Sequence, residues 1–414
     1  MIHMKTSLSH HFLVFVFVIP LYFLSCKKTV VNTTETELQS KLQELVNTNF
    51  AEYKKKFPAY PGGLVLKVLS PKGDFFAAAG MGDNITDQTH FRAASNTKTF
   101  TSTAILLLHQ QGKLNVEHKI TDTIPGSALT YVPATAAYDI PNKSSITILD
   151  LLRHRAGVFD VSNQEIPDTV SAPVPYKGKN YLEYVMLKDS LHTFTFDELV
   201  NTVAECKLSY FKPNTGYHYS NTGYSILGKI IERVSGKSYQ QFLTSDIMKP
   251  MGMINSSMPV LGTDVNLPSQ FASGYIYANN SVVNVTASNI SANVAEGNLI
   301  TTPLELASFL KKLLTGKGVL NTYMVNSVMM NYKSSSDLNA GGYGCGLTYI
   351  NHLGYGHTGA HEGYLSQMVY DPVTGFTAVA YTNAWNFQAG MTTLVEQLRD
   401  LLETTCYQSK AILN

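Results

Sequence analysis

The chain has 414 residues, of which 44% are hydrophobic and 15% charged, and its formal charge is +1. This composition suits a globular protein of two structural regions, and the near-neutral charge gives no indication of a nucleic-acid partner. The cysteines that follow Cys26, namely Cys206, Cys345 and Cys406, are far apart and show no disulfide framework or metal-ligand spacing, so we expect buried free thiols and no metal or cofactor.

The N-terminus has the pattern of a targeting segment. Residues 12–24 are almost wholly apolar and follow Lys5, and this run is shorter than the roughly 20 residues that span a membrane, which predicts a signal peptide at 1–25. The residues up to Cys26 resemble a bacterial lipoprotein processing site, although Phe23 stands where leucine is usual. We therefore expect a lipoprotein linker at 26–36 and a periplasm-facing protein of the cell envelope, anchored to the membrane through a lipid at Cys26. Simple secretion is the alternative.

The next elements alternate between helix and strand patterns. Apolar residues at helical spacing predict a first helix over 38–53. Two apolar runs, 64–69 and 75–79, flank a turn with Pro71 and Gly73 and predict a β-hairpin. A long apolar helix then begins at Ser95 and stops before Gly112.

Helices and loops dominate the middle of the chain, and strands return near its end. Helices are predicted at 146–155, 196–205, 222–234 and 239–248, with a long loop at 160–190. A helix at 303–314 precedes strands at 346–350, 364–370 and 376–381, and a helix at 390–402 is expected to close the ordered part. This order predicts an α/β fold: an antiparallel sheet flanked by helices, from 37–112 and 291–414, with a mostly helical domain inserted at 113–290.

Ser95 and Lys98 form the first part of a candidate nucleophilic site. Residues three apart lie on the same face of a helix, so the Ser95 hydroxyl and the Lys98 amine are expected side by side. An amine next to a hydroxyl can activate it as a nucleophile. The same Ser-x-x-Lys pattern also occurs at Ser25, Ser209 and Ser308, but only the Ser95 copy opens a long apolar helix.

Two later segments add to this pair. Tyr219 and Asn221 follow in the helical region, and His357, Thr358 and Gly359 form the one occurrence of Lys or His, then Thr or Ser, then Gly. Lys98 and Tyr219 are expected to share the proton of Ser95 as a coupled pair. The N–H of Ser95 at a helix start and the N–H of Ala360 are the predicted donors to an oxyanion.

Together these motifs resemble the penicillin-recognising serine hydrolases, which include class C β-lactamases, D-alanyl-D-alanine carboxypeptidases and related esterases. Further similar segments lie at 111–114, 146–157, 249–253, 295–299 and 356–364. The resemblance implies a β-lactamase/transpeptidase-like fold. It also implies roles for the motif residues: nucleophile, Ser95; proton transfer, Lys98 and Tyr219; substrate binding, Asn221, His357, Thr358 and Gly359.

The resemblance also implies an activity. We expect a serine hydrolase that forms a covalent acyl-enzyme with D-alanyl peptide-like amides, because some carboxypeptidases of this group have histidine at the His357 position. A terminal carboxylate is best bound by an arginine, and the sequence has none between Arg233 and Arg399, which argues against a carboxypeptidase. An esterase, a β-lactamase or a non-catalytic binder of cell-wall fragments are the alternatives. The loop at 160–190 is expected to shape substrate entry, and the oligomeric state stays open.

Overall fold

The computed structural model of the protein describes residues 33–333 and 342–414. The predicted signal peptide, Cys26 and residues 27–32 of the predicted linker lie outside these residues. Helix α1, Thr33–Lys56, starts inside the predicted linker, and Glu35 in its first turn is favourably placed at the positive end of the helix dipole. In the described part of the chain, no helix is both long and apolar enough to cross a membrane.

A seven-stranded antiparallel sheet joins the two ends of the chain. Its order is β2-β1-β13-β12-β11-β10-β9. The strands are β1 Leu64–Ser70, β2 Gly73–Ala79, β9 Gly342–Tyr343, β10 Thr348–Ile350, β11 Gly354–His361, β12 Tyr364–Tyr370 and β13 Thr377–Thr382. The predicted hairpin of β1 and β2 is confirmed, since Ser70 pairs with Gly73. The predicted strands at 364–370 and 376–381 also form a hairpin, β12 with β13, in which Tyr370 pairs with Thr377.

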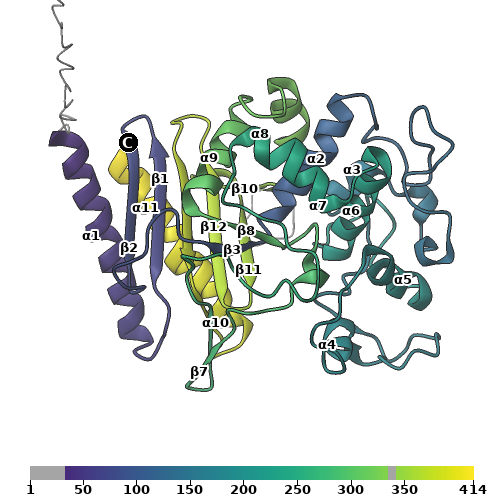
Figure 1. The fold of residues 1–414 in the computed structure, drawn as a ribbon, viewed down its shortest axis with the longest axis horizontal. Coiled ribbons are helices and arrows are strands. Elements are labelled where there is room, and N and C mark those ends of the chain that lie inside the picture. Colours follow the sequence, from purple (N-terminus) through teal and green to yellow (C-terminus); the bar gives the residue numbers. More distant parts are fainter. Residues whose placement is uncertain (1–32, 334–341) are drawn as a thin grey trace, which may run out of the picture.

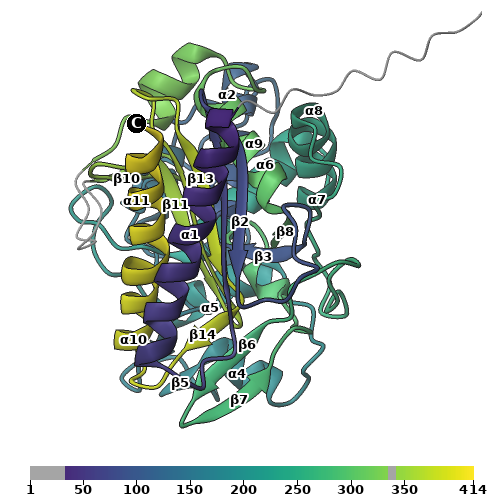
Figure 2. The same cartoon turned by 90° about the vertical axis from the view of Figure 1, so that its left-hand side faces the viewer.

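Both faces of the sheet are buried. Alternate residues of β1 point to opposite faces, so Val65 belongs to one apolar core and Leu66 to the other. Helix α1 and the C-terminal helices cover the Leu66 face (Figure 2). These C-terminal elements are α10 Met391–Glu396, the π-helical η6 Gln397–Glu403 and α11 Thr404–Leu413. The prediction that order ends near 402 is therefore wrong, because Leu401, Leu402, Cys406 and Leu413 are all buried in this core.

The other face of the sheet carries the helix that follows Ser95 and the inserted region (Figure 1). Helix α2, Thr97–Gln110, and helix α9, Pro303–Leu314, pack here, and Phe100 stacks on Phe309 with ring centroids 3.8 Å apart. A short pair of strands, β3 Phe91–Ala94 and β8 Leu299–Thr301, runs up to the start of α2. Cys206, Cys345 and Cys406 are free and buried, as predicted.

The inserted region is mostly helical. Its helices are η1 Ala136–Tyr138, η2 Lys143–Ser145, α3 Ile148–Leu152, α4 Tyr181–Met186, α5 Phe196–Cys206, α6 Asn221–Ser235, α7 Tyr239–Phe242, η3 Leu243–Met248 and α8 Lys249–Met251. Two further short helical stretches follow it, η4 Ser291–Asn293 and η5 Met324–Met329. Helix α3 is shorter than predicted because His154 adopts a left-handed backbone conformation, with φ of 56°.

None of the strand pairs outside the seven-stranded sheet was predicted, including that of β3 and β8. The loop expected at 160–190 contains β4 Glu165–Ile166 and β5 Lys179–Asn180 as well as α4. The hairpin of β6 Tyr275–Ala278 and β7 Ser281–Asn284 lies within the predicted helical domain, yet β6 pairs in parallel with β14 Ala384–Asn386 from the other end of the chain. The last part of the insertion is therefore hydrogen-bonded to the sheet side of the molecule.

Candidate active site

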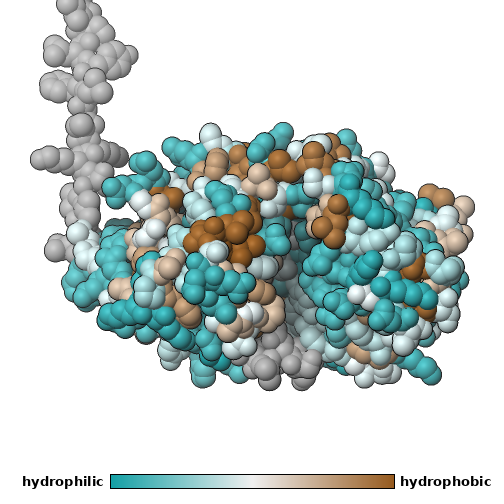
Figure 3. All heavy atoms as spheres, turned by 90° about the horizontal axis from the view of Figure 1, so that it is seen from below, coloured by the Kyte–Doolittle hydropathy of each residue, from teal (hydrophilic) through white to brown (hydrophobic). Residues whose placement is uncertain are grey.

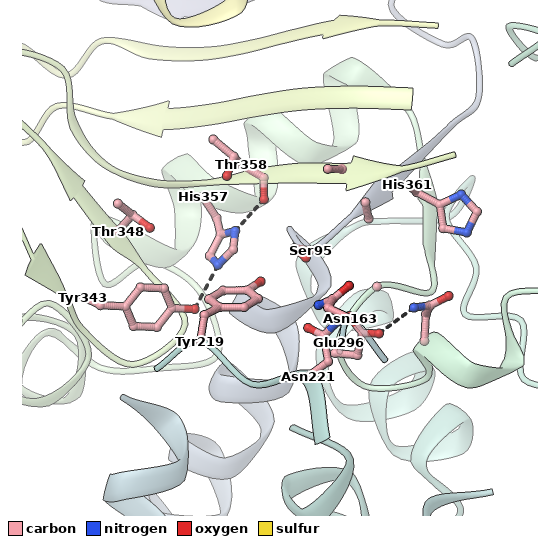
Figure 4. Close-up of a pocket in the computed structure, with 14 residues that line it drawn as sticks. Ser95, Asn163, Tyr219, Asn221, Glu296, Tyr343, Thr348, His357, Thr358 and His361 are labelled. Carbon is pink, nitrogen blue, oxygen red and sulfur yellow. Dashed lines mark hydrogen bonds between the residues drawn. The ribbon is translucent and has the colours of Figure 1, made fainter. Parts of the chain in front are cut away.

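A pocket opens where β11 faces the helical region, and from below the surface is hollowed between these two sides (Figure 3). Most of the predicted site residues line it together with residues that the sequence did not single out. The lining residues are Ala94, Ser95, Asn163, Tyr219, Asn221, Asn293, Glu296, Gly297, Tyr343, Thr348, His357, Thr358, Ala360 and His361 (Figure 4).

Ser95 sits in a tight turn between β3 and α2. It is the one residue between 91 and 100 that is not fully buried. Helix α2 begins at Thr97 and not at Ser95, but the Lys98 N–H donates to the Ser95 carbonyl at 3.0 Å, which keeps the two side chains on one face. The turn is braced by Thr97, whose hydroxyl donates to the Ala94 carbonyl at 2.7 Å and accepts from the Leu299 N–H at 2.9 Å.

Lys98 is buried directly behind Ser95. Its Nζ lies 3.3 Å from Ser95 Oγ and 4.7 Å from the ring centroid of Tyr219. Its ammonium also donates to Glu296, both to the main-chain carbonyl at 2.9 Å and to the carboxylate Oε2 at 3.1 Å. Burial lowers the pKa of Lys98 and raises the pKa of Glu296, because desolvation penalises both charged forms. Lys98 therefore loses its proton to become a neutral amine more easily here than it would in water.

Tyr219 and Asn221 reach the pocket from the N-terminus of α6. Ser220 caps this helix by accepting from the Gly223 N–H at 3.2 Å, so Tyr219 precedes the helix and Asn221 opens it. Asn221 is 6% exposed, and its Oδ1 has no hydrogen-bond partner among the described residues. A buried acceptor without a partner is costly, so a substrate N–H would stabilise it.

Two buried residues that the sequence did not assign hold this segment in place. His154 Nδ1 accepts from the Ser220 N–H at 3.1 Å, and its ring lies against Tyr219 with centroids 4.3 Å apart. Asp160 accepts from Asn163 Nδ2 at 2.8 Å and from the Ser162 N–H at 3.1 Å, and its carboxylate also bonds to the backbone of Asn221. His154 lies within the segment 146–157, which resembles the family, and Asp160 is the first residue of the predicted loop at 160–190. These positions in the sequence were the only indication that either residue could lie near the site.

His357 is placed in the pocket by β11, but it is not a cation. Its Nδ1 lies 2.6 Å from the Thr358 carbonyl and must donate to it, so Nε2 accepts from the Tyr343 hydroxyl at 2.9 Å (Figure 4). Burial lowers the pKa of His357 to about 3. A neutral histidine provides no charge for a substrate carboxylate.

Gly359 lets β11 approach the turn at Ser95. A methyl group in its place would lie 2.2 Å from the Ala93 carbonyl oxygen and 2.5 Å from Ser366 Oγ. Ala360 follows on the same strand and lines the pocket with Ser95. Strand β10 pairs with β11 only up to Gly356, so no other described strand covers the β11 edge at Ala360. Its N–H remains the predicted second donor to an oxyanion.

The family is established by comparison with known proteins. The family model named Beta-lactamase matches residues 50–401. The chain belongs to the Beta-lactamase family. Penicillin-binding protein 4* of Bacillus subtilis is 31% identical over 187 residues, which are 45% of this chain and 34% of that protein. Protein flp of Staphylococcus aureus is 26% identical over 333 residues, which are 78% of this chain and 59% of that protein. The matches thus span between a third and three fifths of the length of these relatives.

Solved structures of the same fold cover most of the chain. The D-amino acid amidase of Ochrobactrum anthropi SV3, in complex with L-phenylalanine amide, is 25% identical with a TM-score of 0.69, covering 89% of this chain and 99% of that one. The penicillin-binding protein of Bacillus halodurans shares the fold at 20% identity with a TM-score of 0.62, covering 85% and 99%. The predicted β-lactamase/transpeptidase-like fold and the resemblance to serine hydrolases are therefore confirmed.

Proposed function

We propose that this chain hydrolyses peptide-like amides through an acyl-enzyme on Ser95. The observation that carries the proposal is the contact of Ser95 Oγ with Lys98 Nζ at 3.3 Å, with the ring centroid of Tyr219 4.7 Å from the same nitrogen. In the first step, Ser95 Oγ bonds to the carbonyl carbon and its proton passes to the pair of Lys98 and Tyr219. The C–N bond then breaks as the departing amine takes that proton. A water oxygen then bonds to the acyl carbon as its proton passes to the same pair, the bond from that carbon to Ser95 Oγ breaks, and Oγ regains the proton as the acid leaves.

The oxyanion of each step would be held by the N–H groups of Ser95 and Ala360. Removal of one donor of this kind costs about 10² to 10³ in rate, so these groups would contribute a large part of the acceleration. Asn221 would bind the acyl-side amide, because its Oδ1 lies in the pocket without another acceptor role. His357, Thr358 and Gly359 would form the strand along which the substrate lies.

D-Alanyl peptides are the first substrate class in this proposal, as in D-alanyl-D-alanine carboxypeptidases. The neutral His357 and the pairing of Lys98 with Glu296 leave no spare cation among the described lining residues to bind a terminal carboxylate. This favours amides without a terminal carboxylate, and a D-amino acid amidase is among the similar structures. An esterase, a β-lactamase and a non-catalytic binder of cell-wall fragments are the competing functions.

Mass spectrometry of the intact protein tests the mechanism. Incubation with a fluorophosphonate or a penicillin should add one adduct at Ser95, and Ser95→Ala should remove it. Ser209→Ala is the matched control, because Ser209 begins another Ser-x-x-Lys pattern but is exposed and lies outside the pocket. An adduct that persists in Ser95→Ala, or that never forms, would contradict the mechanism.

Turnover of a substrate panel separates the competing functions. The panel contains a D-Ala-D-Ala peptide, a D-amino acid amide, a short-chain aryl ester and nitrocefin. Preferred hydrolysis of either amide supports the proposal, and preference for the ester or nitrocefin favours the alternatives. Labelling of Ser95 without turnover of any compound would indicate a binder.

We also propose that Cys26 carries a lipid anchor and that the chain faces the periplasm. The support is the sequence pattern around Cys26. Cys26→Ala should move the full-length protein from the membrane fraction to the soluble fraction, without loss of Ser95 labelling. Membrane association that is unchanged in Cys26→Ala would exclude this anchor.

A further inference from the structure

We propose that Glu296 is a positioning residue of the catalytic machinery. Its carboxylate and its own main-chain carbonyl together hold Lys98 Nζ against Ser95, and the charge of that carboxylate couples the proton on Lys98 to the activity of the enzyme. This inference rests on the proposed function of Ser95. Glu296 lies between η4 and β8, far along the chain from both partners, and lines the same pocket (Figure 4).

Among the described residues, two of the oxygens within hydrogen-bond distance of Lys98 Nζ belong to Glu296. The Lys98 amine contacts Ser95 Oγ at 3.3 Å, the Glu296 carbonyl at 2.9 Å and Glu296 Oε2 at 3.1 Å. An ammonium has three donors, so each can point at one of these oxygens. An amine can donate to the two oxygens of Glu296 and accept from the Ser95 hydroxyl with its lone pair. In either state, Glu296 fixes the direction from which Nζ meets Ser95.

The carboxylate is itself held rigidly. Asn293 Nδ2 donates to Glu296 Oε1 at 2.6 Å, which leaves Oε2 turned towards Lys98. The side chains of Lys98 and Glu296 are 0% and 2% exposed, so water screens their interaction poorly. A buried pair of this kind loses much more when one partner is removed than an exposed pair does.

Several groups influence the pKa of Lys98, and they do so in opposite directions. Desolvation lowers the pKa of Lys98, while Glu296 and the buried Asp160 raise it. The titratable groups that face Lys98 are Glu296, Asp160, His154, His357, Tyr219 and Tyr224. Both histidines have lowered pKa values and are neutral near pH 7. Glu296 is therefore the carboxylate in direct contact with the lysine, and its removal shifts the equilibrium towards the amine.

The test is the pH profile of Ser95 labelling by a fluorophosphonate. Glu296→Gln keeps the shape of the side chain and removes its charge. We expect a rate of labelling lower by about tenfold or more at neutral pH, since Lys98 is held less firmly. The labelling rate is expected to rise with pH as Lys98 loses its proton. In the variant, this rise should occur at a pH lower by about 1 unit or more, because loss of a nearby opposite charge makes the lysine easier to deprotonate.

The matched control is Glu305→Gln. Glu305 is also buried and hydrogen-bonded, to the Asn255 N–H at 2.9 Å, but it lies outside the pocket. Its substitution should leave the shape of the pH profile unchanged. If Glu296→Gln does not fold, Glu296→Asp carries the test, because it keeps the charge but withdraws the carboxylate from Lys98. It should label more slowly, with a smaller shift of this rise in the same direction.

The outcomes separate this inference from the proposed function. If wild-type protein is not labelled at Ser95, the proposed function fails, and with it the basis of this inference. If wild-type protein is labelled at Ser95, and a folded Glu296 variant has the same rate and the same profile, the role of Glu296 is wrong while the function stands. A slower rate with an unshifted profile would also overturn it, because it would indicate a merely structural role.

Discussion

The Tyr343 hydroxyl donates a hydrogen bond to Nε2 of His357 across 2.9 Å. Because the other ring nitrogen donates to the Thr358 carbonyl, both nitrogens of His357 are occupied and the ring is neutral. The sequence motif alone predicted a histidine that binds the substrate. In the folded protein, this ring is a buried part of the wall behind Tyr219, and protonation of Nε2 would require the Tyr343 hydroxyl to turn and accept.

The neutral state of His357 predicts how stability depends on pH. Burial lowers the pKa of His357 from 6.5 to about 3, so between these values the unfolded chain binds a proton that the folded chain does not. The free energy of unfolding must then rise with pH in this range, by up to about 1.4 kcal/mol per pH unit from this one group. His357→Asn should flatten this dependence in urea denaturation measured between pH 4 and pH 7. His352→Asn, at an exposed residue, should not.

Tyr219 is predicted to be essential for proton transfer. Tyr219→Phe keeps the ring over Lys98 and removes the hydroxyl, so kcat/KM for amides should fall by about 10² to 10⁴ with little change in melting temperature. Tyr217→Phe is the control, because Tyr217 lies two residues away and does not line the pocket. A Tyr219→Phe enzyme that retains wild-type turnover would leave Lys98 as the sole base.

Gly359 is predicted to tolerate no side chain. In Gly359→Ala, the methyl group would meet the Ala93 carbonyl oxygen at 2.2 Å, so β11 must move away from the nucleophile turn. We expect a loss of about 1 to 3 kcal/mol in the free energy of unfolding, together with slower Ser95 labelling. Gly223→Ala has its nearest neighbour at 3.7 Å in a helix, and should instead stabilise the protein by about 0.5 to 1 kcal/mol. Equal stability of the two variants in denaturant titrations would refute the close approach.

Thr97 is predicted to brace the nucleophile turn. Thr97→Val removes a hydroxyl that satisfies both the Ala94 carbonyl and the Leu299 N–H, and each buried group left unpaired costs about 1 to 3 kcal/mol. The same change at Thr103 removes a hydroxyl that donates to the Thr99 carbonyl in the preceding turn of α2, and should cost less. Thermal unfolding of the two variants measures the difference. A smaller loss at Thr97 than at Thr103 would contradict the bracing role.

Much of the fold could be predicted because its signals are local. The hairpin of β1 and β2 and the helix Pro303–Leu314 depend on turn residues, capping and apolar periodicity within a few residues of one another. The parallel pairing of β6 with β14 could not be predicted, because it joins segments about a hundred residues apart through backbone hydrogen bonds that carry no sequence code. The helix at Thr404–Leu413 could not be predicted, because the polar residues Thr405 and Ser409 occupy two of its buried positions and weaken the apolar pattern.

The sequence by itself determined which chemistry is present: a serine, a lysine and a tyrosine in ordered motifs, and a glycine where a strand must approach closely. Only the tertiary structure decided the state of these groups. It brought Glu296 to within 3.1 Å of Lys98 and Tyr343 to within 2.9 Å of His357. The reason is physical, because protonation depends on burial and on neighbours from distant segments, and neither is encoded in the spacing of a motif.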